Sequence, residues 1–416
     1  METSTPKPVT KKKAKPAVKS FAKIQEPEIL QHSHFGGFKA QNEEFDYWID
    51  YKDVQGKVPD AVTGTFFRIG PGRNEIGGEK FGHWFDGDGM MNSVSFFPKG
   101  IRYRNKYVRT PKYKAETKAQ HIVKRSFGHN APGGILANFG RLPANCANTS
   151  LVYHAGKLLA LWEGGRPWQL DPSTLDTVGE YDFNKRLHPL AAFSAHGKTS
   201  ARNGCYYNFG LRPKLNGQGA IDLYKISPSG YLVQKASVDI DFMCFCHDFA
   251  LTEHYAVFFI SPLAMKSPLP FMAGLSTFDQ ALKWQPNLGM KVYVVRLSDF
   301  KLERMYFIDQ PFVAIHYGNA WEENGKIIVD LTRFEDFRVN ELLRNVFTLP
   351  ANGAGGVLYR YTLDMVNGNV TGVPFDKAKR GEFPQWDPRR TTYPTRYIFE
   401  ACMYRDDSPF FDAVQR

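Results

Sequence analysis

The sequence contains no uninterrupted run of 18 apolar residues, which a membrane-spanning helix would need. Its N-terminal segment has no apolar core of the kind found in secretory signal peptides. Cysteine is scarce and odd in number, so no disulfide framework is predicted; the five are Cys146, Cys205, Cys244, Cys246 and Cys402. We therefore predict reduced thiols and a cytoplasmic location, and composition leaves a plastid location open.

Several common catalytic motifs are also missing. A Gly-Lys-Thr triplet occurs at residues 197–199, but Ala192 stands where a phosphate-binding loop needs glycine. The chain has neither the Gly-x-Ser-x-Gly turn of serine hydrolases nor the His-Glu-x-x-His helix of zinc proteases. Nucleotide-binding, serine hydrolase and zinc protease functions therefore have no motif to support them.

Most of the positive charge lies at the N-terminus. The formal net charge of the 416 residues is +11, and the first 23 residues contain seven lysines and one acidic residue, which leaves +5 for the other 393. This Lys-, Pro- and Ala-rich segment is too polar to fold alone, so we predict a disordered basic arm over residues 1–34 and one folded domain over 35–416. Charge alone does not support nucleic acid as a partner.

After the arm, the chain consists of short runs rich in β-branched and aromatic residues, separated by turn-forming clusters. Strands are predicted at residues 64–67, 93–97, 150–153, 158–162, 257–260 and 292–296. Helical spacing of apolar residues is local, at 276–283 and 334–346. The pattern predicts an all-β fold, and a propeller is the β architecture that most easily holds about 380 ordered residues in one unit.

Three histidines each lie at the end of a strand-like run: His196, His247 and His316. Their separations of 51 and 69 residues are roughly one propeller blade each, so equivalent inner strands could direct all three imidazoles at one axis. Each histidine taken alone is more simply a hydrogen-bonded core residue. Zinc binding by Cys244, Cys246 and His247 together is disfavoured, because alternate side chains of a strand point to opposite faces.

Two motifs near the start of the domain, residues 64–73 (Gly-Thr-Phe-Phe-Arg-Ile-Gly-Pro-Gly-Arg) and 83–90 (His-Trp-Phe-Asp-Gly-Asp-Gly-Met), resemble the signature of carotenoid cleavage oxygenases. The resemblance continues through residues 103–110, the three histidine motifs and the Gly-Glu-Phe-Pro motif at 381–384. It implies a seven-bladed β-propeller with short helical insertions at the substrate face. It also implies Fe(II) on the propeller axis, held by four histidines.

His196, His247 and His316 match the first three iron ligands of that family. Glu163 and Glu382 match family glutamates that accept the second N–H of a ligating histidine and so fix its tautomer and orientation. Neutral imidazoles suit Fe(II), and four of them leave two coordination positions open for dioxygen and water. The implied reaction is cleavage of a conjugated C=C bond by O₂ into two carbonyl products, with no protein nucleophile or base.

The sequence departs from the family after Glu382. No histidine follows His316, although the family places its fourth ligand near the C-terminus. We therefore expect the C-terminal part of the domain and the fourth ligand to be missing and the closing blade to be incomplete. The alternative to an active dioxygenase is a non-catalytic carotenoid-binding remnant, or a fragment.

Trp162 precedes Glu163, at a position where the stilbene-cleaving members resemble one another in carrying lysine. An indole cannot supply the ammonium group that meets a phenol, so the resemblance favours a carotenoid or apocarotenoid substrate. The plainer interpretation of Trp162 is core packing.

Residues 263–275 are strongly apolar, and Lys266 is the single charged side chain between residues 256 and 277. In the family a similar segment touches the membrane beside the substrate tunnel, so we expect peripheral membrane contact here. The alternative is that the segment packs beneath neighbouring blades.

Overall fold

The computed structural model describes residues 33–416 except 215, 266, 348–354, 406–407 and 409. Residues 1–32, which make up nearly all of the predicted basic arm, lie outside the described residues. Within the described part, no helix combines the length and the hydropathy needed to cross a bilayer.

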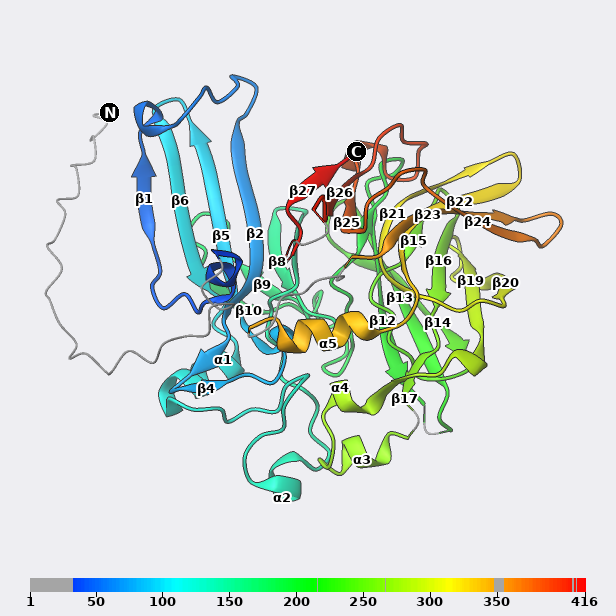
Figure 1. Ribbon diagram of the computed structural model, residues 1–416, viewed down its shortest axis with the longest axis horizontal. Coiled ribbons are helices and arrows are strands. Elements are labelled where there is room, and N and C mark those ends of the chain that lie inside the picture. Colours follow the sequence, from blue (N-terminus) through cyan, green and yellow to red (C-terminus); the bar gives the residue numbers. More distant parts are fainter. Residues whose placement is uncertain (1–32, 215, 266, 348–354, 406–407, 409) are drawn as a thin grey trace, which may run out of the picture.

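The first half of the domain forms three antiparallel four-stranded sheets (Figure 1). The first sheet has the order β1 (Asp46–Ile49), β6 (Gly100–Tyr107), β5 (Asp88–Phe97), β2 (Gly64–Arg73). The second has the order β10 (Thr177–Glu180), β9 (Trp168–Leu170), β8 (Lys157–Leu161), β7 (Ser150–His154). The third has the order β11 (Lys198–Thr199), β12 (Tyr206–Pro213), β13 (Gly219–Ile226), β14 (Leu232–Ile240).

The second half repeats this arrangement. The fourth sheet has the order β15 (Ala250–Leu251), β16 (Tyr255–Ile260), β19 (Met290–Arg296), β20 (Leu302–Ile308). The fifth has the order β21 (Val313–Glu323), β22 (Lys326–Phe334), β23 (Val357–Asp364), β24 (Val370–Pro374). The sixth has three strands, β25 (Gly381–Gln385), β26 (Phe399–Cys402) and β27 (Ala413–Gln415). Small two-stranded sheets are formed by β3 (Glu75–Ile76) with β4 (Glu79–Lys80) and by β17 (Leu263–Met265) with β18 (Leu282–Trp284).

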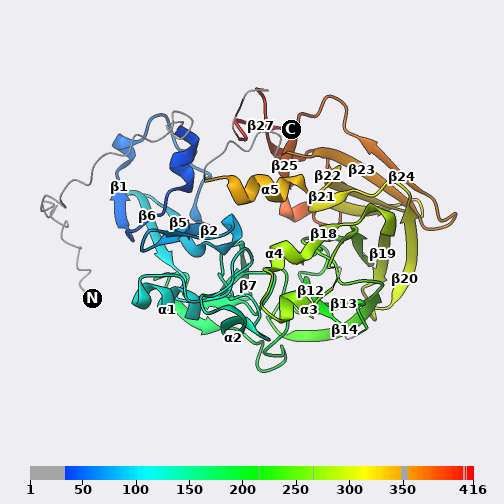
Figure 2. The same ribbon diagram turned by 60° about the horizontal axis from the view of Figure 1, so that its bottom comes forward.

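Figure 2 shows the six larger sheets following one another in chain order around a ring, as the blades of a propeller do. The all-β propeller prediction is confirmed, and all six predicted strand segments fall in or at the end of strands. The count of seven blades is wrong for the described residues. Their strands belong to five four-stranded sheets, one three-stranded sheet and the two small two-stranded sheets, so no seventh blade forms there.

The central strand β16 is apolar on both faces because it lies between two neighbouring blades. In β16, Ala256, Phe258 and Ile260 pack in the cluster shared with the third sheet, whereas Val257 and Phe259 pack in the cluster shared with the fifth. Successive side chains of a strand point to opposite faces, so burial of both faces needs a continuous apolar run. The core is therefore a series of layers between blades.

The helices are short and lie together at one end of the sheets, the lower end in Figure 1. They are α1 (Pro111–Ala119), α2 (Gly134–Asn138), α3 (Leu269–Met272), α4 (Phe278–Ala281) and α5 (Arg338–Asn345). Short 3-10 helices occur at Ser33–Phe38, Tyr51–Asp53, Trp84–Asp86, Pro286–Leu288 and Pro388–Arg390. The two predicted helical stretches contain α4 and α5, which are shorter than predicted; Thr277 and Gln280 form a capping box that starts α4.

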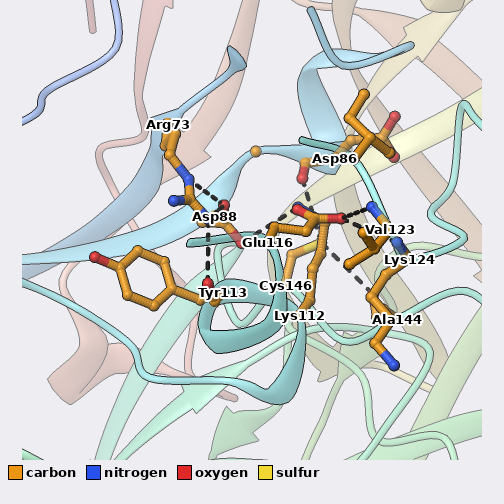
Figure 3. A network of polar contacts seen from close by, with 12 residues as sticks. Arg73, Asp86, Asp88, Lys112, Tyr113, Glu116, Val123, Lys124, Ala144 and Cys146 are labelled. Carbon is orange, nitrogen blue, oxygen red and sulfur yellow. Dashed lines mark hydrogen bonds and ion pairs between the residues drawn. The ribbon is translucent and has the colours of Figure 1, made fainter. Parts of the chain in front are cut away.

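Helix α1 is fastened to the first sheet by a buried charge network (Figure 3). Lys112 Nζ lies 3.2 Å from Asp88 Oδ1 and 2.9 Å from Glu116 Oε2, and the Arg73 guanidinium lies 2.7 Å from Asp88 Oδ2. The side chains of Lys112 and Glu116 are fully buried. Two cations and two carboxylates balance each other there, as buried charges require.

Candidate metal centre

The three histidines predicted as ligands come from three consecutive blades. His196 lies two residues before β11, His247 lies three residues before β15, and His316 lies inside β21. These strands are the first strands of the third, fourth and fifth sheets. The three imidazoles thus come from the start of three consecutive blades and lie close together.

The imidazoles form one compact group. One nitrogen from each of His196, His247 and His316 lies within 4.8 Å of the others, and this is the one such group with three or more candidate ligands among the described residues. Nε2 of His247 lies 3.1 Å from Nε2 of His316. The ring of His196 lies 4.3 Å from that of His247 and 4.9 Å from that of His316. The group as described consists of histidines alone.

Two glutamates contact the outer nitrogens of this group. Glu163 Oε1 contacts His247 Nδ1, and Glu382 Oε2 lies 2.8 Å from His316 Nδ1. A carboxylate at Nδ1 holds the proton on that nitrogen and leaves Nε2 with a free lone pair. The structure therefore places both glutamates where a histidine-orienting role requires them.

The protonation state of His196 also suits metal binding. Burial, followed by the neighbouring imidazoles of His247 and His316, lowers the pKa of His196 well below its usual value. Burial also opposes protonation of His247, but the Glu163 carboxylate outweighs it and raises the pKa of His247. Because its pKa is lowered, His196 is neutral at physiological pH. Its buried Nε2 has no hydrogen-bond partner among the described residues.

These observations fit a bound cation. The Nε2 lone pairs of His247 and His316 would repel each other at 3.1 Å unless a proton or a metal ion lay between them. Two imidazole nitrogens about 2.1 Å from one metal ion and at right angles to each other are about 3.0 Å apart. The unpartnered Nε2 of His196 would be satisfied in the same way. Imidazole suits Fe, Zn, Cu and Ni, so the ligand set by itself does not choose among them.

A pocket of about 900 Å³ opens beside this centre. His247, Glu163 and Trp162 line it. Large apolar side chains make up much of the remaining wall, namely Phe85, Phe127, Leu142, Phe245, Met265, Phe271, Met272 and Phe278. A long apolar ligand could therefore lie next to the histidine group.

Trp162 lies one residue beyond β8, where its indole packs over Gly164. A Cβ atom added at Gly164 would lie 2.4 Å from Cζ3 of Trp162. The indole is half-buried and lines the pocket beside Glu163, so it forms part of the pocket wall.

The predicted surface segment at residues 263–275 is only partly exposed. Leu263 and Phe271 are buried, whereas Leu269 and Leu275 are 73% and 65% exposed. Sequence reasoning missed a second exposed apolar segment, on and after α2, in which Leu136 is 93% exposed. The two segments are neighbours, because the backbone N–H of Gly140 donates to the carbonyl of Met272. We call the exposed residues Ile135, Leu136, Phe139, Leu142, Leu269, Met272 and Leu275 the apolar rim.

Sequence reasoning did not name the other aromatic residues of the pocket. Phe85 lies inside the motif at 83–90 and Phe245 lies two residues before His247, so both had a local signal. Phe127 and Phe278 come from loops and helices without a distinctive pattern, and only the tertiary fold brings them together.

The comparison with known families agrees with this geometry. The sequence pattern of the family described as "Retinal pigment epithelial membrane protein" matches residues 38–416. The chain belongs to this family. The retinal pigment epithelial membrane protein family contains the carotenoid cleavage oxygenases, so the family predicted from the motifs is confirmed. As a member of this family, the chain is an oxygenase.

Several characterised relatives are similar over most of this chain. Apocarotenoid-15,15'-oxygenase of Synechocystis is 33% identical over 381 residues, which are 87% of this chain and 74% of that protein. Lignostilbene-alpha,beta-dioxygenase isozyme III of Sphingomonas paucimobilis is 30% identical over 83% of this chain and 70% of its own length. Isoeugenol monooxygenase of Pseudomonas putida is 28% identical over 83% of this chain and 71% of its own length.

Solved structures of the family have the same fold. The crystal structure of cobalt-substituted Synechocystis apocarotenoid oxygenase superimposes with a TM-score of 0.79 at 31% identity, covering 89% of this chain and 78% of that one. A chimera of that enzyme with the retinal pigment epithelial protein gives the same values. The cobalt-substituted form shows that the Synechocystis enzyme accepts cobalt.

Proposed function

We propose that this chain is an Fe(II)-dependent dioxygenase that cleaves one conjugated C=C bond of a carotenoid or apocarotenoid. The reaction balances without another reductant: one O₂ and one C=C bond give two C=O groups, as aldehydes or ketones. The observation that carries the proposal is the group of His196, His247 and His316 beside a large, mostly apolar pocket. Fe(II), when bound, supplies the electrons that activate dioxygen and an open position at which it reacts.

The protein side chains have three tasks in this proposal. The histidines hold the metal, and Glu163 and Glu382 keep Nδ1–H of His247 and His316 pointing away from it. Trp162 and the phenylalanines of the pocket bury the polyene, which needs no polar partner along its length. The position of the bound polyene relative to the histidine group selects the bond that is cut.

The substrate class is supported by the pocket and by the relatives. A hydroxystilbene needs a partner for its phenol, whereas the wall beside Glu163 offers the indole of Trp162. The Synechocystis relative acts on apocarotenoids, and it is 33% identical to this chain, whereas the lignostilbene dioxygenase is 30% identical. We therefore propose an apocarotenoid or a carotenoid rather than a stilbene.

The apolar rim is proposed as a membrane contact. Met272 and Leu142 line the pocket and also belong to the rim, so a substrate dissolved in lipid could enter without crossing water. In this arrangement the short helices near the pocket lie on the face of the propeller from which the substrate enters. A cytoplasm-like location, the division into an arm and one domain, and an incomplete closing blade remain predictions from the sequence.

The decisive experiment measures bound iron per chain and the loss of apocarotenal absorbance under oxygen. His247→Ala is the test variant, and His121→Ala, an exposed histidine in a turn, is the matched control. We expect close to one iron per chain and turnover in the wild type and in H121A, with both lost in H247A. Carotenoid binding without turnover in iron-loaded wild type would instead support the non-catalytic alternative.

A further inference from the structure

One carboxylate touches all three segments that carry the histidines. Asp248 follows His247 in the chain, and its side chain is 2% exposed. Lys198, two residues after His196, donates from Nζ to Asp248 Oδ1 at 2.7 Å. The backbone N–H of Tyr317, next to His316, donates to Asp248 Oδ2 at 2.9 Å. The side chain thus joins the segments of the third, fourth and fifth sheets at the level of the histidines.

The surroundings of Asp248 make this connection rigid. The backbone N–H of Phe249 donates to Oδ1 at 2.7 Å, so both oxygens are engaged. The Lys198 side chain is only 9% exposed and lies near the rings of Phe249 and Trp386. A buried ion pair allows far less movement than an exposed one, because few alternative partners are within reach.

A second set of hydrogen bonds supports two of the three segments. Ser194 Oγ donates to the carbonyl of His247 at 3.3 Å and accepts from the backbone N–H of His196 at 3.0 Å. This serine links the His196 segment with the His247 segment, whereas Asp248 also reaches the strand that carries His316.

We propose that Asp248, together with Lys198, is a positioning residue for the metal centre. It holds three separate strands in the register that brings three imidazoles onto one ion, without touching the ion itself. The role differs from that of Glu163 and Glu382, which each orient a single imidazole. The metal-binding part of the inference rests on the proposed function, whereas the strand connection does not.

Asp248→Asn separates this role from simple space filling. Asparagine has nearly the same volume, but its single acceptor oxygen cannot serve Lys198 and the Tyr317 N–H at once, and its NH₂ group would face another donor. One of the two connections must therefore be lost. The matched control is Asp88→Asn in the first sheet, which also removes a buried carboxylate from two cationic partners, Arg73 and Lys112 (Figure 3).

The first measurement is backbone amide exchange by mass spectrometry on the metal-free full chain. We expect D248N to exchange faster than wild type in residues 194–200 and 314–320, and D88N to leave both segments unchanged. Equal protection of these segments in wild type and D248N would overturn the strand connection. This result does not depend on whether the chain binds iron.

The second measurement is titration with Co²⁺, followed by its visible absorption bands. We expect D248N to bind cobalt about 10–100-fold more weakly than wild type, the usual effect of removing an outer partner of a metal site, with altered bands. D88N is expected to lower the melting temperature but to keep the wild-type affinity and spectrum. Wild-type cobalt affinity and bands in D248N would overturn the positioning role, whereas absence of cobalt binding in the wild type would refute the proposed metal site instead.

A double variant separates the effect of an unpaired buried charge in D248N from the loss of positioning. Lys198→Met combined with Asp248→Asn removes the unpaired buried charge, so we expect the melting temperature to recover at least partly. Cobalt affinity is expected to stay low, because the strands are still unconnected. Recovery of full affinity in the double variant would show that an unpaired charge, and not lost positioning, was responsible.

Discussion

His316 and Glu382 meet across two blades: Nδ1 of the histidine on β21 lies 2.8 Å from Oε2 of the glutamate on β25. The glutamate is almost completely buried, so the contact is not weakened by water. The sixth sheet therefore takes part in the histidine group, although it supplies no histidine of its own.

Replacing that carboxylate should weaken metal binding. In Glu382→Gln the side chain can still accept from His316 Nδ1–H, but without the charge that raises the basicity of the ring. We expect Co²⁺ to bind roughly 10-fold more weakly, and Glu382→Ala to have a larger effect. Titration with Co²⁺ checks this, with Glu116→Gln, a buried glutamate of α1, as the control. Unchanged affinity in E382Q would remove Glu382 from the site.

Trp162 should determine how tightly the polyene binds. Trp162→Ala removes a large apolar surface from the pocket wall, so KM for an apocarotenal is expected to rise about 10-fold while kcat changes little. Steady-state kinetics in detergent micelles would measure both values. Trp48→Ala, which changes a 57% exposed tryptophan of β1, is the matched control. An unchanged KM in W162A would assign the indole to core packing alone.

Glu400 should make stability depend on pH. Burial raises its pKa to about 7 from an ordinary 4.5, although Thr332 and Gln415 both donate to its carboxylate. The folded state therefore holds a proton that the unfolded state releases between about pH 4.5 and 7, and stability falls as pH rises through this window.

Glu400→Gln removes this dependence, because its carbonyl can accept from Gln415 and its NH₂ can donate to Thr332 Oγ1. Relative to wild type, we expect a gain of about 2–3 kcal/mol in the free energy of unfolding at pH 8 and little change at pH 4. Urea unfolding at both pH values measures it, and the exposed Glu75→Gln is the control. The same effect at both pH values would mean that ionisation of Glu400 is not the cause.

The apolar rim should bind lipid. Leu136→Asp and Leu269→Asp place charges on two highly exposed apolar positions, and we expect co-flotation with phosphatidylcholine vesicles to fall at least several-fold. Val366→Asp is the control, since Val366 is 75% exposed and lies between β23 and β24, outside the rim. If L136D and L269D float with vesicles as well as the control V366D does, the rim is not the lipid contact.

The buried lysine of α1 should be important for folding and not for metal binding. Lys112→Met leaves Asp88 and Glu116 without that cation in a fully buried site, and we expect a loss of about 3–5 kcal/mol in the free energy of unfolding. Urea unfolding measures the loss, and an unchanged Co²⁺ spectrum would show that the effect stays within the first sheet. A loss below 1 kcal/mol would mean that water or Arg73 replaces the ammonium group.

The sequence alone predicted the class of fold and the residues that form the histidine group. Alternating and continuous apolar runs reflect a strand period of two and burial of one or both faces, which are properties of each local segment. His196, His247 and His316, with Glu163 and Glu382, were predicted because each lies in a distinctive motif. The blade count was wrong because it was taken from the family resemblance, whereas the pairing of strands into six sheets depends on contacts between distant segments.

Only the tertiary structure decided how these parts act together. Lys198, Asp248 and Tyr317 lie 50 and 69 residues apart in the chain, yet their bonds meet on one carboxylate. The apolar rim likewise combines α2 with α3, and a third of the described residues of the predicted membrane segment are buried. Hydrogen bonds and burial depend on where two distant segments meet in space, and neither residue type nor spacing along one segment contains that information.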